Sequence, residues 1–395
     1  MRCYNKYGNL PYAPNGFTRR RNRRGVTLIF ALFLMSTLIG MLAFSIDIGY
    51  LATSKAEMRR TADAAALAGG WQLIDCKVKG ESSVVSSSMM RSAASQTALA
   101  NQVCNNGPIL NTYGTSSDIT EGYLESLASN AVLSSNSSNP FHAVRVRVQR
   151  TAESNGIVPF FFSKVFGETG REMAVTATSA LATQIKGFAT PASSNSTLNL
   201  LPFALDLQTW NDMLSGGGSD IYNYNTVSNT LTSGSDGIRE VNLYPQGTGS
   251  PGNRGTVDIG GSNNSTADLA RQIVDGISTS DFNALGKPLI LDSNGKMTLS
   301  GDTGISAGVK DELASIIGQT RIIPIFSSVS GTGNNANYTI VQWVGIRILH
   351  VELTGEMSSK QLIVQPSPVI ARNVVPADAS RIWSSSIFSP VILVQ

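Results

Sequence analysis

The stretch VTLIFALFLMSTLIGMLAFSI, residues 26–46, has 21 residues and no charged side chain. As a helix that rises about 1.5 Å per residue it is roughly 31 Å long, which matches the hydrocarbon core of a bilayer. We therefore predict a transmembrane helix over residues 25–46. The next stretch, DIGYLATSKAEMRRTADAAALAGGWQLI at residues 47–74, is rich in alanine, lacks proline and repeats apolar residues at helical spacing. It predicts that the same helix extends beyond the membrane to residue 75.

The first 24 residues form a basic leader. They carry seven Lys and Arg and no acidic residue, whereas the remaining 371 residues carry 23 basic and 27 acidic side chains. The basic isoelectric point therefore comes from this leader and does not indicate a nucleic-acid-binding surface. By the positive-inside rule the leader lies in the cytoplasm and residues 47–395 lie outside it. A cleaved secretory signal is the alternative, although its apolar core is usually only about 7–15 residues long.

The junction between leader and helix, RRGVTLIF at residues 23–30, resembles the cleavage region of type IV prepilins. The resemblance implies cleavage by a prepilin peptidase between Gly25 and Val26, which would remove all seven basic residues of the leader. Phe30 stands where that family has a glutamate, so the buried charge that pairs with a neighbouring subunit in pilins is missing here. The alternative is that Gly25 is only a small residue at the start of a helix.

Three segments carry a further resemblance: FAL at residues 30–32, IDIGY at residues 46–50 and TADAAALAG at residues 61–69. Over residues 22–72 the chain is similar to the N-terminal segment of TadE/TadG-like proteins, which are pilin-like components of the bacterial tight-adherence (Flp pilus) system. The resemblance implies a structural protein of the bacterial cell envelope, in a pilus or surface filament that acts in adhesion. It implies three partners: other pilin-like or Tad-system subunits, further copies of the chain, and the inner membrane.

Six positions of the long helix are candidates for packing or assembly: Phe30, Asp47, Gly49, Asp63, Ala65 and Gly69. Small residues let a neighbouring element approach the helix closely. The sequence leaves open whether that element is another subunit or the protein's own sheet. Asp63 follows Arg59 and Arg60 by one turn, so it forms either an intersubunit pair or a local ion pair worth about 0.3–0.5 kcal/mol.

The rest of the chain predicts an α+β fold, beginning with a pilin-like domain over residues 76–185. A helix is predicted over residues 87–103. Apolar and polar residues alternate over residues 142–149, and β-branched residues are frequent over residues 173–181, so both segments predict strands. Between them, residues 158–167 start with Val-Pro, end at a glycine and predict a short packed helix.

A second α+β domain is predicted over residues 200–395. Residues 186–199 (KGFATPASSNSTLN) have the composition of a linker and set the boundary between the two domains. Helices capped at Ser265 or Thr266 and at Ser306 alternate with strand signals, which together predict four to six strands. The apolar end of the chain, residues 389–395, predicts an added edge strand.

The predicted topology separates the three cysteines. Cys3 lies in the reducing cytoplasm, whereas Cys76 and Cys104 lie outside, where one disulfide can form. Cys76 ends the long helix and Cys104 follows the next one, so the bridge requires the two Cα atoms to come within about 7 Å. Two reduced, buried thiols are the alternative.

No catalytic, cofactor-binding or metal-binding motif emerges from the sequence. The chain has two histidines, His142 and His350, and neither adjoins a Ser or Cys nucleophile. Asp220 and Asp236 lie in a Gly/Ser/Asn-rich stretch, for which a solvated loop is expected and Ca²⁺ binding is the alternative. We therefore expect a structural protein with no cofactor and no small-molecule substrate. A membrane-tethered ligand-binding module outside any filament and an anchored hydrolase are the alternatives.

Overall fold

The computed structural model describes residues 24–128, 130–193, 196–244, 254–261, 265–331, 333–377 and 386–394. Most of the basic leader, including Cys3, therefore lies outside the described residues. The chain divides into two compact units. The first comprises Met1–Thr53 and Val158–Arg171, and the second comprises Ser54–Ile157 and Glu172–Gln395.

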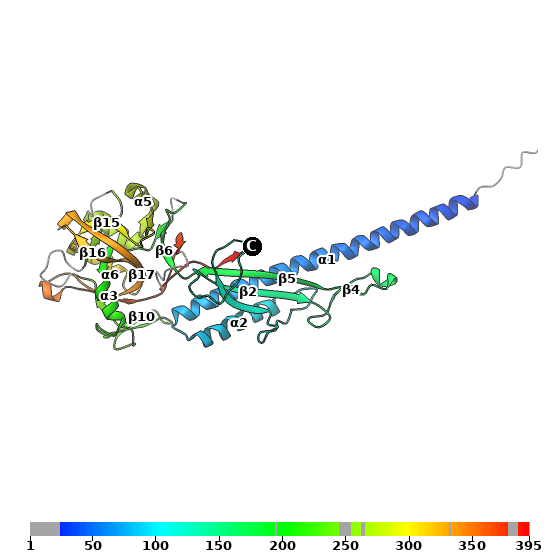
Figure 1. Cartoon of the computed structure of the whole chain (residues 1–395), viewed down its shortest axis with the longest axis horizontal. Coiled ribbons are helices and arrows are strands. Elements are labelled where there is room, and N and C mark those ends of the chain that lie inside the picture. The colour runs from blue at the N-terminus through cyan, green and yellow to red at the C-terminus, as the bar shows by residue number, and fades with distance from the viewer. Residues whose placement is uncertain are drawn as a thin grey trace, which may run out of the picture. The chain divides into compact units, whose positions relative to one another are not determined.

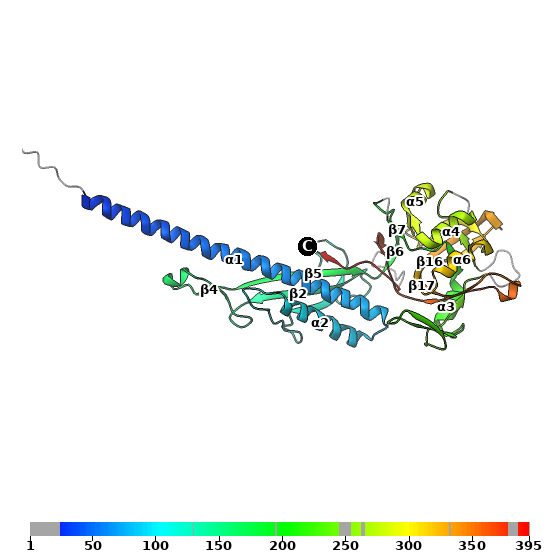
Figure 2. The same ribbon diagram turned by 180° about the vertical axis from the view of Figure 1, so that it is seen from behind.

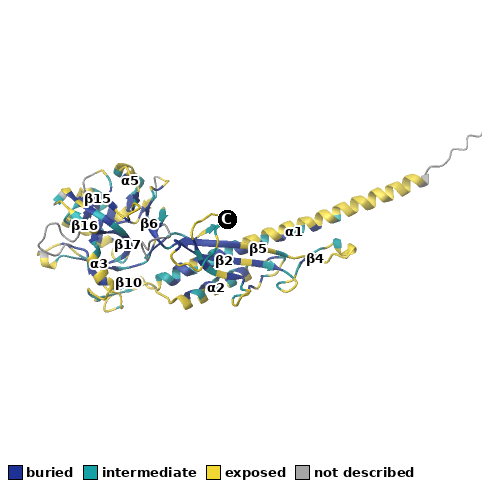
Figure 3. Ribbon diagram, in the orientation of Figure 1, coloured by how far each residue is buried: buried dark blue, intermediate teal, exposed yellow. Residues whose placement is uncertain are grey.

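A single helix, α1 (Arg24–Val78), contains both the apolar stretch and its alanine-rich extension, as the sequence predicts. All large apolar side chains between Val26 and Ile46 are exposed (Figure 3). The hydroxyls of Ser36, Thr37 and Ser45 donate to carbonyl oxygens three or four residues back, so the helix itself satisfies them. By length and composition this part of α1 can cross a membrane.

The C-terminal half of α1, from Ser54, and α2 (Ser83–Ala100) lie side by side against one face of an antiparallel sheet (Figures 1 and 2). In the described residues this sheet has the strand order β1 (Ile119–Leu124), β2 (Phe141–Arg150), β5 (Met173–Ala182) and β22 (Ile392–Val394). Both predicted strands are present, and the end of the chain forms an edge strand of this sheet. The core between helices and sheet is made mainly of alanine, methionine and valine: Met58, Ala62, Ala65, Ala66, Met90, Ala94, Val144, Val146 and Val148.

A hairpin belonging to the first unit connects β2 to β5. It consists of β3 (Val158–Pro159), the 3₁₀ helix η1 (Ser163–Phe166) and β4 (Gly170–Arg171). The predicted short helix thus forms and ends at Gly167, whose φ of 92° suits a glycine. The prediction that it is packed is wrong, because Val165 is 84% and Phe166 83% exposed.

A barrel dominates the C-terminal part of the second unit. In the described residues five strands pair in the order β17 (Ala336–Glu352), β15 (Met297–Asp302), β12 (Arg254–Val257), β8 (Phe203–Asp206) and β16 (Thr320–Ser330), and β16 closes the ring by pairing with β17. β18 (Gln361–Pro366) and β11 (Val241–Asn242) extend the sheet beyond β17. This sheet exceeds the predicted four to six strands because short strands such as β8 and β11 give little sequence signal.

Short elements decorate the barrel. Its helices are α3 (Leu207–Leu214), α4 (Thr266–Asp275), α5 (Thr279–Leu285), α6 (Lys310–Ser315), η2 (Ala307–Val309), η3 (Gly333–Asn335) and η4 (Met357–Ser359). Its remaining strands are β6 (Ile185–Phe188), β7 (Thr197–Leu198), β9 (Tyr222–Asn225), β10 (Thr230–Ser233), β13 (Ile277–Ser278), β14 (Leu289–Ile290), β19 (Val369–Ile370), β20 (Val374–Pro376) and β21 (Ile387–Phe388). Ser265 caps α4 and Ser306 caps η2, the positions expected from the sequence.

The segment predicted as a linker, residues 186–199, is largely part of the packed structure. β6 pairs with β14 and β20, and Phe188 is fully buried with its ring 5.6 Å from that of Trp343. The same core cluster contains Phe141 and Ala143 of β2 on the face of the sheet that points away from the helices. The linker prediction fails because this segment, although rich in Ser, Thr and Asn, contains most of β6 and all of β7, with Phe188 and Leu198 buried. The sheet and the barrel share a core.

Candidate functional site

The most distinctive polar site of the first unit surrounds Asp47. This residue follows Ile46, the last residue of the apolar stretch, and only 2% of it is exposed. A carboxylate so well buried needs hydrogen-bond donors. The hairpin between β2 and β5 supplies them.

Four donors from three consecutive hairpin residues surround the Asp47 carboxylate. Oδ1 accepts the backbone N–H of Phe161 at 2.8 Å, and both oxygens lie 3.3 Å from the backbone nitrogen of Phe162. Oδ2 accepts the N–H of Ser163 at 2.8 Å and its hydroxyl at 2.7 Å. These donors stand at the N-terminal end of η1, where no side chain of the hairpin itself forms a cap. Asp47 therefore caps η1 from a site more than 110 residues earlier in the chain.

The ionised form of Asp47 is favoured in this site. Burial alone raises the pKa of the carboxyl, but the hydroxyl of Ser163 and the three backbone N–H groups outweigh it and lower the pKa from 3.8 to about 2. The carboxylate is consequently charged at neutral pH and holds the hairpin against α1.

An aromatic contact supports the same docking. The rings of Tyr50 and Phe161 meet edge to face, with centroids 5.0 Å apart and an interplanar angle of 75°. Tyr50 lies about one helical turn after Asp47, so both contacts arise from one face of α1. Together they fix the hairpin beside the end of the apolar stretch.

The other predicted positions in the first half of α1 make no comparable contact. Val26 and Phe30 are each 71% exposed, and a Cβ built on Gly49 would meet nothing within 4 Å. Gly25 lies in the first turn of the helix. Val26, Phe30 and Gly49 present open surface. The predicted roles of all four residues in processing and assembly remain proposals.

Ala65 and Gly69 are instead buried within their own chain. Ala65 is fully buried, and a Cβ on Gly69 would lie 3.1 Å from Cγ1 of Val144 and 3.5 Å from Cβ of Ala94. The sequence left open which element packs against these two residues, and in the structure α2 and β2 of the same chain cover them. Asp63 pairs locally with Arg59, with 3.2 Å between Oδ1 and Nε.

The predicted disulfide is wrong: both Cys76 and Cys104 are free. α2 runs back along α1, so Cys104 lies beside the start of the packed half, with its Sγ 3.2 Å from Oγ of Ser54. Cys76 follows Ser54 by 22 residues, roughly 33 Å along the helix. A disulfide requires Cα atoms within about 7 Å. The antiparallel helical pair thus separates the two thiols.

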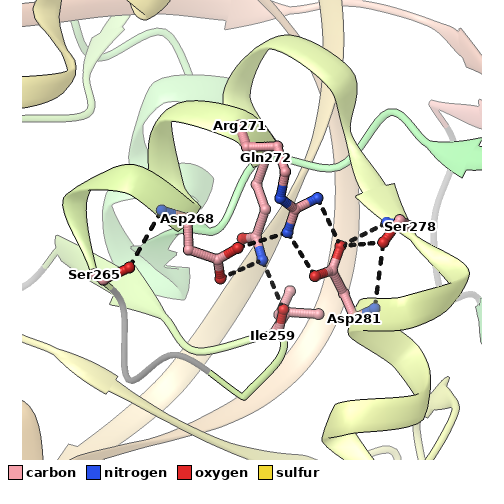
Figure 4. Close-up of polar contacts among 7 residues, drawn as sticks. All are labelled: Ile259, Ser265, Asp268, Arg271, Gln272, Ser278 and Asp281. Carbon is pink, nitrogen blue, oxygen red and sulfur yellow. Dashed lines mark hydrogen bonds and ion pairs between the residues drawn. The ribbon is translucent and has the colours of Figure 1, made fainter.

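Near the barrel, charged and polar side chains of α4 and α5 form hydrogen bonds and ion pairs with one another. Nη2 of Arg271 lies 2.6 Å from carboxylate oxygens of both Asp268 and Asp281 (Figure 4). Asp281 also accepts from the backbone N–H and the hydroxyl of Ser278, which caps α5. This network connects α4 with α5 and indicates a structural role.

The candidate calcium loop is likewise organised by its own hydrogen bonds. Asp220 accepts from the hydroxyl of Ser235 at 2.7 Å and from the backbone N–H groups of Asp236 and Gly237.

The two histidines of the chain have separate partners. His142 contacts Glu121 at 2.9 Å, and His350 stacks on Tyr222. Among the described residues, no group of three or more His, Cys, Asp or Glu is placed to hold a metal ion.

Comparison with known proteins addresses the N-terminal part of the chain. Residues 25–72 match the family described as putative Flp pilus-assembly TadE/G-like, and residues 68–179 match the family described as putative Tad-like Flp pilus-assembly. The two matches confirm the resemblance seen in the sequence, and both lie within residues 25–179 of the chain. No curated protein and no solved structure matches the chain.

The second match ends at residue 179 and includes the whole hairpin. Sequence reasoning selected Asp47 but missed its partners, Phe161 to Ser163. The only local signal was the unusual run PFFF at residues 159–162, and nothing in the sequence connects that run to residue 47.

Proposed function

We propose that this chain is a membrane-anchored, non-enzymatic, pilin-like minor subunit or assembly component of a Flp/Tad-type pilus or surface filament that acts in adhesion. The observation that carries the proposal is the division of α1. Residues 26–46 expose every large apolar side chain, while from Ser54 onward one face of the helix is buried against α2 and an antiparallel sheet. A long helix followed by such a sheet is the plan expected of a pilin-like subunit.

The proposed topology places the leader in the cytoplasm and the residues after Asp47 outside it, at the bacterial cell envelope. The basic leader supports this orientation through the positive-inside rule. Cleavage between Gly25 and Val26 is the form of processing that fits a pilin, and an uncleaved leader fits a permanent anchor. Mass spectrometry of the mature N-terminus distinguishes the two forms.

Partners in this proposal are other Tad-system or pilin-like subunits, further copies of the chain, and the inner membrane. The exposed half of α1 offers them its whole apolar circumference. Restoring a carboxylate by Phe30→Glu should improve incorporation into a filament only if the leader is cleaved, because the charge needs the free amine of a neighbouring Val26.

Cell fractionation combined with filament shearing tests the proposal. The full chain should be found in the membrane fraction and in sheared filaments, and Leu38→Arg should lower its amount in both, since a central charge costs about 3 kcal/mol of insertion. Leu38→Ile is the matched control and should behave like the parent. Recovery of the parent chain in the soluble cytoplasmic fraction would contradict the proposal.

A second candidate function, a membrane-tethered ligand-binding module, has its own observation. A mostly apolar pocket of about 370 Å³ lies between the sheet and the C-terminal segments, and it is lined by Leu127, Phe141, Val374, Pro390 and Ile392 among others. Its chemistry suits a small apolar group. Monomeric protein with saturable ligand binding that Phe141→Ser abolishes would favour this function over a filament subunit.

A further inference from the structure

The hairpin between β2 and β5 exposes an unusual number of large apolar side chains. Phe161 is 56%, Phe162 43%, Val165 84% and Phe166 83% exposed, all within six residues. Soluble surfaces seldom gather such side chains unless something covers them. Lys164 stands among them and is also exposed.

The position of the hairpin indicates what covers it. Asp47 binds the base of η1 and directly follows Ile46, so the hairpin is fixed at the end of the apolar stretch of α1. Figures 1 and 2 both show the hairpin that contains β4 running along α1 in the direction of its N-terminus. Its tip therefore points toward the part of the helix that is suited to the bilayer.

The hairpin is also equipped for an environment of low polarity. Backbone groups must find partners inside the protein where water is scarce. The N–H groups of Phe161, Phe162 and Ser163 donate to Asp47, and that of Phe160 donates to Thr169. Those of Val165, Gly167 and Glu168 donate to carbonyl oxygens within the hairpin. What remains exposed at the tip is mainly side-chain hydrocarbon.

We propose that the tip of this hairpin, Phe161 to Phe166, inserts into the outer interface of the membrane that α1 spans and forms a second contact with lipid. This inference rests on the membrane anchoring in the proposed function. The phenyl rings and Val165 enter the boundary between headgroups and acyl chains, while Lys164 reaches anionic headgroups. The contact limits rotation and tilt of the apolar part of α1, to which Asp47 fixes the hairpin.

A probe attached at the tip tests the proposal directly. The full chain carries Phe166→Cys labelled with an environment-sensitive fluorophore, in a background with the native cysteines replaced, and is reconstituted into phosphatidylcholine–phosphatidylglycerol vesicles with doxyl-labelled lipid. Identical probes at Ile39→Cys, in the apolar stretch, and at Val227→Cys, which is 91% exposed in the second unit, serve as references. Circular dichroism establishes that the labelled chains retain the fold.

The expected result is a blue shift and quenching by lipid at positions 166 and 39, and neither at position 227. Val165→Glu in the position 166 chain should abolish the quenching, whereas Val165→Leu should preserve it, and neither substitution disturbs a buried site. Quenching at 39 without quenching at 166 would overturn the hairpin contact and leave the membrane anchor intact. No quenching at 39 would overturn the anchor and the hairpin contact together. Shielding of 166 that appears only at a high protein-to-lipid ratio would identify a second copy as the occupant and overturn the lipid contact.

Discussion

The two halves of α1 belong to one helix but differ in the exposure of their apolar side chains. Residues 26–46 are richer in bulky apolar residues, and all of these are exposed. From Ser54 onward the helix is rich in alanine, and Met58, Ala62, Ala65 and Ala66 are almost completely buried. The more hydrophobic half is thus the half that the protein does not cover.

Side-chain size explains the difference. Bulky residues surround the whole circumference of the first half, so no single face is shaped to receive another element, as is expected of a helix whose solvent is lipid. In the second half, alanine and glycine on one face let α2 and β2 approach closely. The pattern of small residues, and not the total hydrophobicity, marks the half that packs within the chain.

The strongest test compares one residue type in the two halves. Met58→Ala should lower the free energy of unfolding by about 3 kcal/mol, because it leaves a cavity in the core between α1, α2 and the sheet. Met35→Ala, at a position 64% exposed, should leave it unchanged in detergent. Chemical unfolding monitored by circular dichroism measures both. Equal effects of the two substitutions would remove the distinction between the halves.

Two glycines test the same distinction by adding a side chain instead of removing one. Gly69→Leu should destabilise the protein by about 2 kcal/mol, since the new side chain must displace Val144 and Ala94. Gly40→Leu should be tolerated, because nothing lies within 4 Å of a Cβ at that position. Thermal unfolding of both variants in the same detergent provides the measurement. A stable Gly69→Leu variant would show that α2 does not lie against α1 at this point.

Asp47 stands between the halves, and its removal should loosen only the hairpin. Asp47→Asn loses the charge and one acceptor, so amide exchange at residues 161–163 should accelerate about tenfold while the core remains protected. Asp75→Asn is the control, because Asp75 pairs with Lys79 on the surface. Unchanged exchange in the Asp47 variant would mean that the aromatic contact with Tyr50 suffices to hold the hairpin.

The lowered pKa of Asp47 gives this docking a defined pH dependence. The folded pKa of about 2 lies below the ordinary 3.8, so the carboxylate stabilises the docked hairpin above pH ~4, and this contribution is lost as pH falls toward 2. Pepsin cleavage at the hairpin should therefore increase between pH 4 and pH 2 in the parent. The Asp47→Asn variant should be cleaved readily across the whole range.

The helices and strands of the fold can be predicted from the sequence, whereas the contacts between distant segments cannot. The long helix and strand β2 follow from periodicity, and strand β5 follows from composition. Both are properties of neighbouring residues. The burial of Phe188 and the docking of Asp47 onto Phe161 depend on pairs far apart in the chain. Composition predicts a linker over residues 186–199 because Ser, Thr and Asn are frequent there, although β6 (IKGF) contributes none of them.

For the candidate site, too, the sequence indicates one residue, Asp47, but not the groups that bind it. Asp47 was selected because it ends the apolar stretch, but its donors are backbone N–H groups, which every residue carries and no sequence pattern reveals. The disulfide between Cys76 and Cys104 failed for a geometric reason, since counting cysteines does not say which end of a helical hairpin each occupies. Residues 158–167 predict a packed helix because large apolar residues are usually buried, but these side chains are mostly exposed.

The smallest expected effect concerns Asp63, at the start of the alanine run shared with the TadE/G-like family. Its pair with Arg59 is partly exposed, so Asp63→Asn should lower the free energy of unfolding by only about 0.4 kcal/mol. If Asp63 instead binds a neighbouring subunit, the same substitution should remove the chain from sheared filaments without altering its unfolding. Arg59→Gln separates the two roles: a local pair predicts equal small losses from either substitution, whereas an intersubunit role predicts loss of assembly from Asp63→Asn alone. Quantifying the chain in filaments beside its unfolding midpoint therefore decides whether the packed half of α1 also contacts a partner.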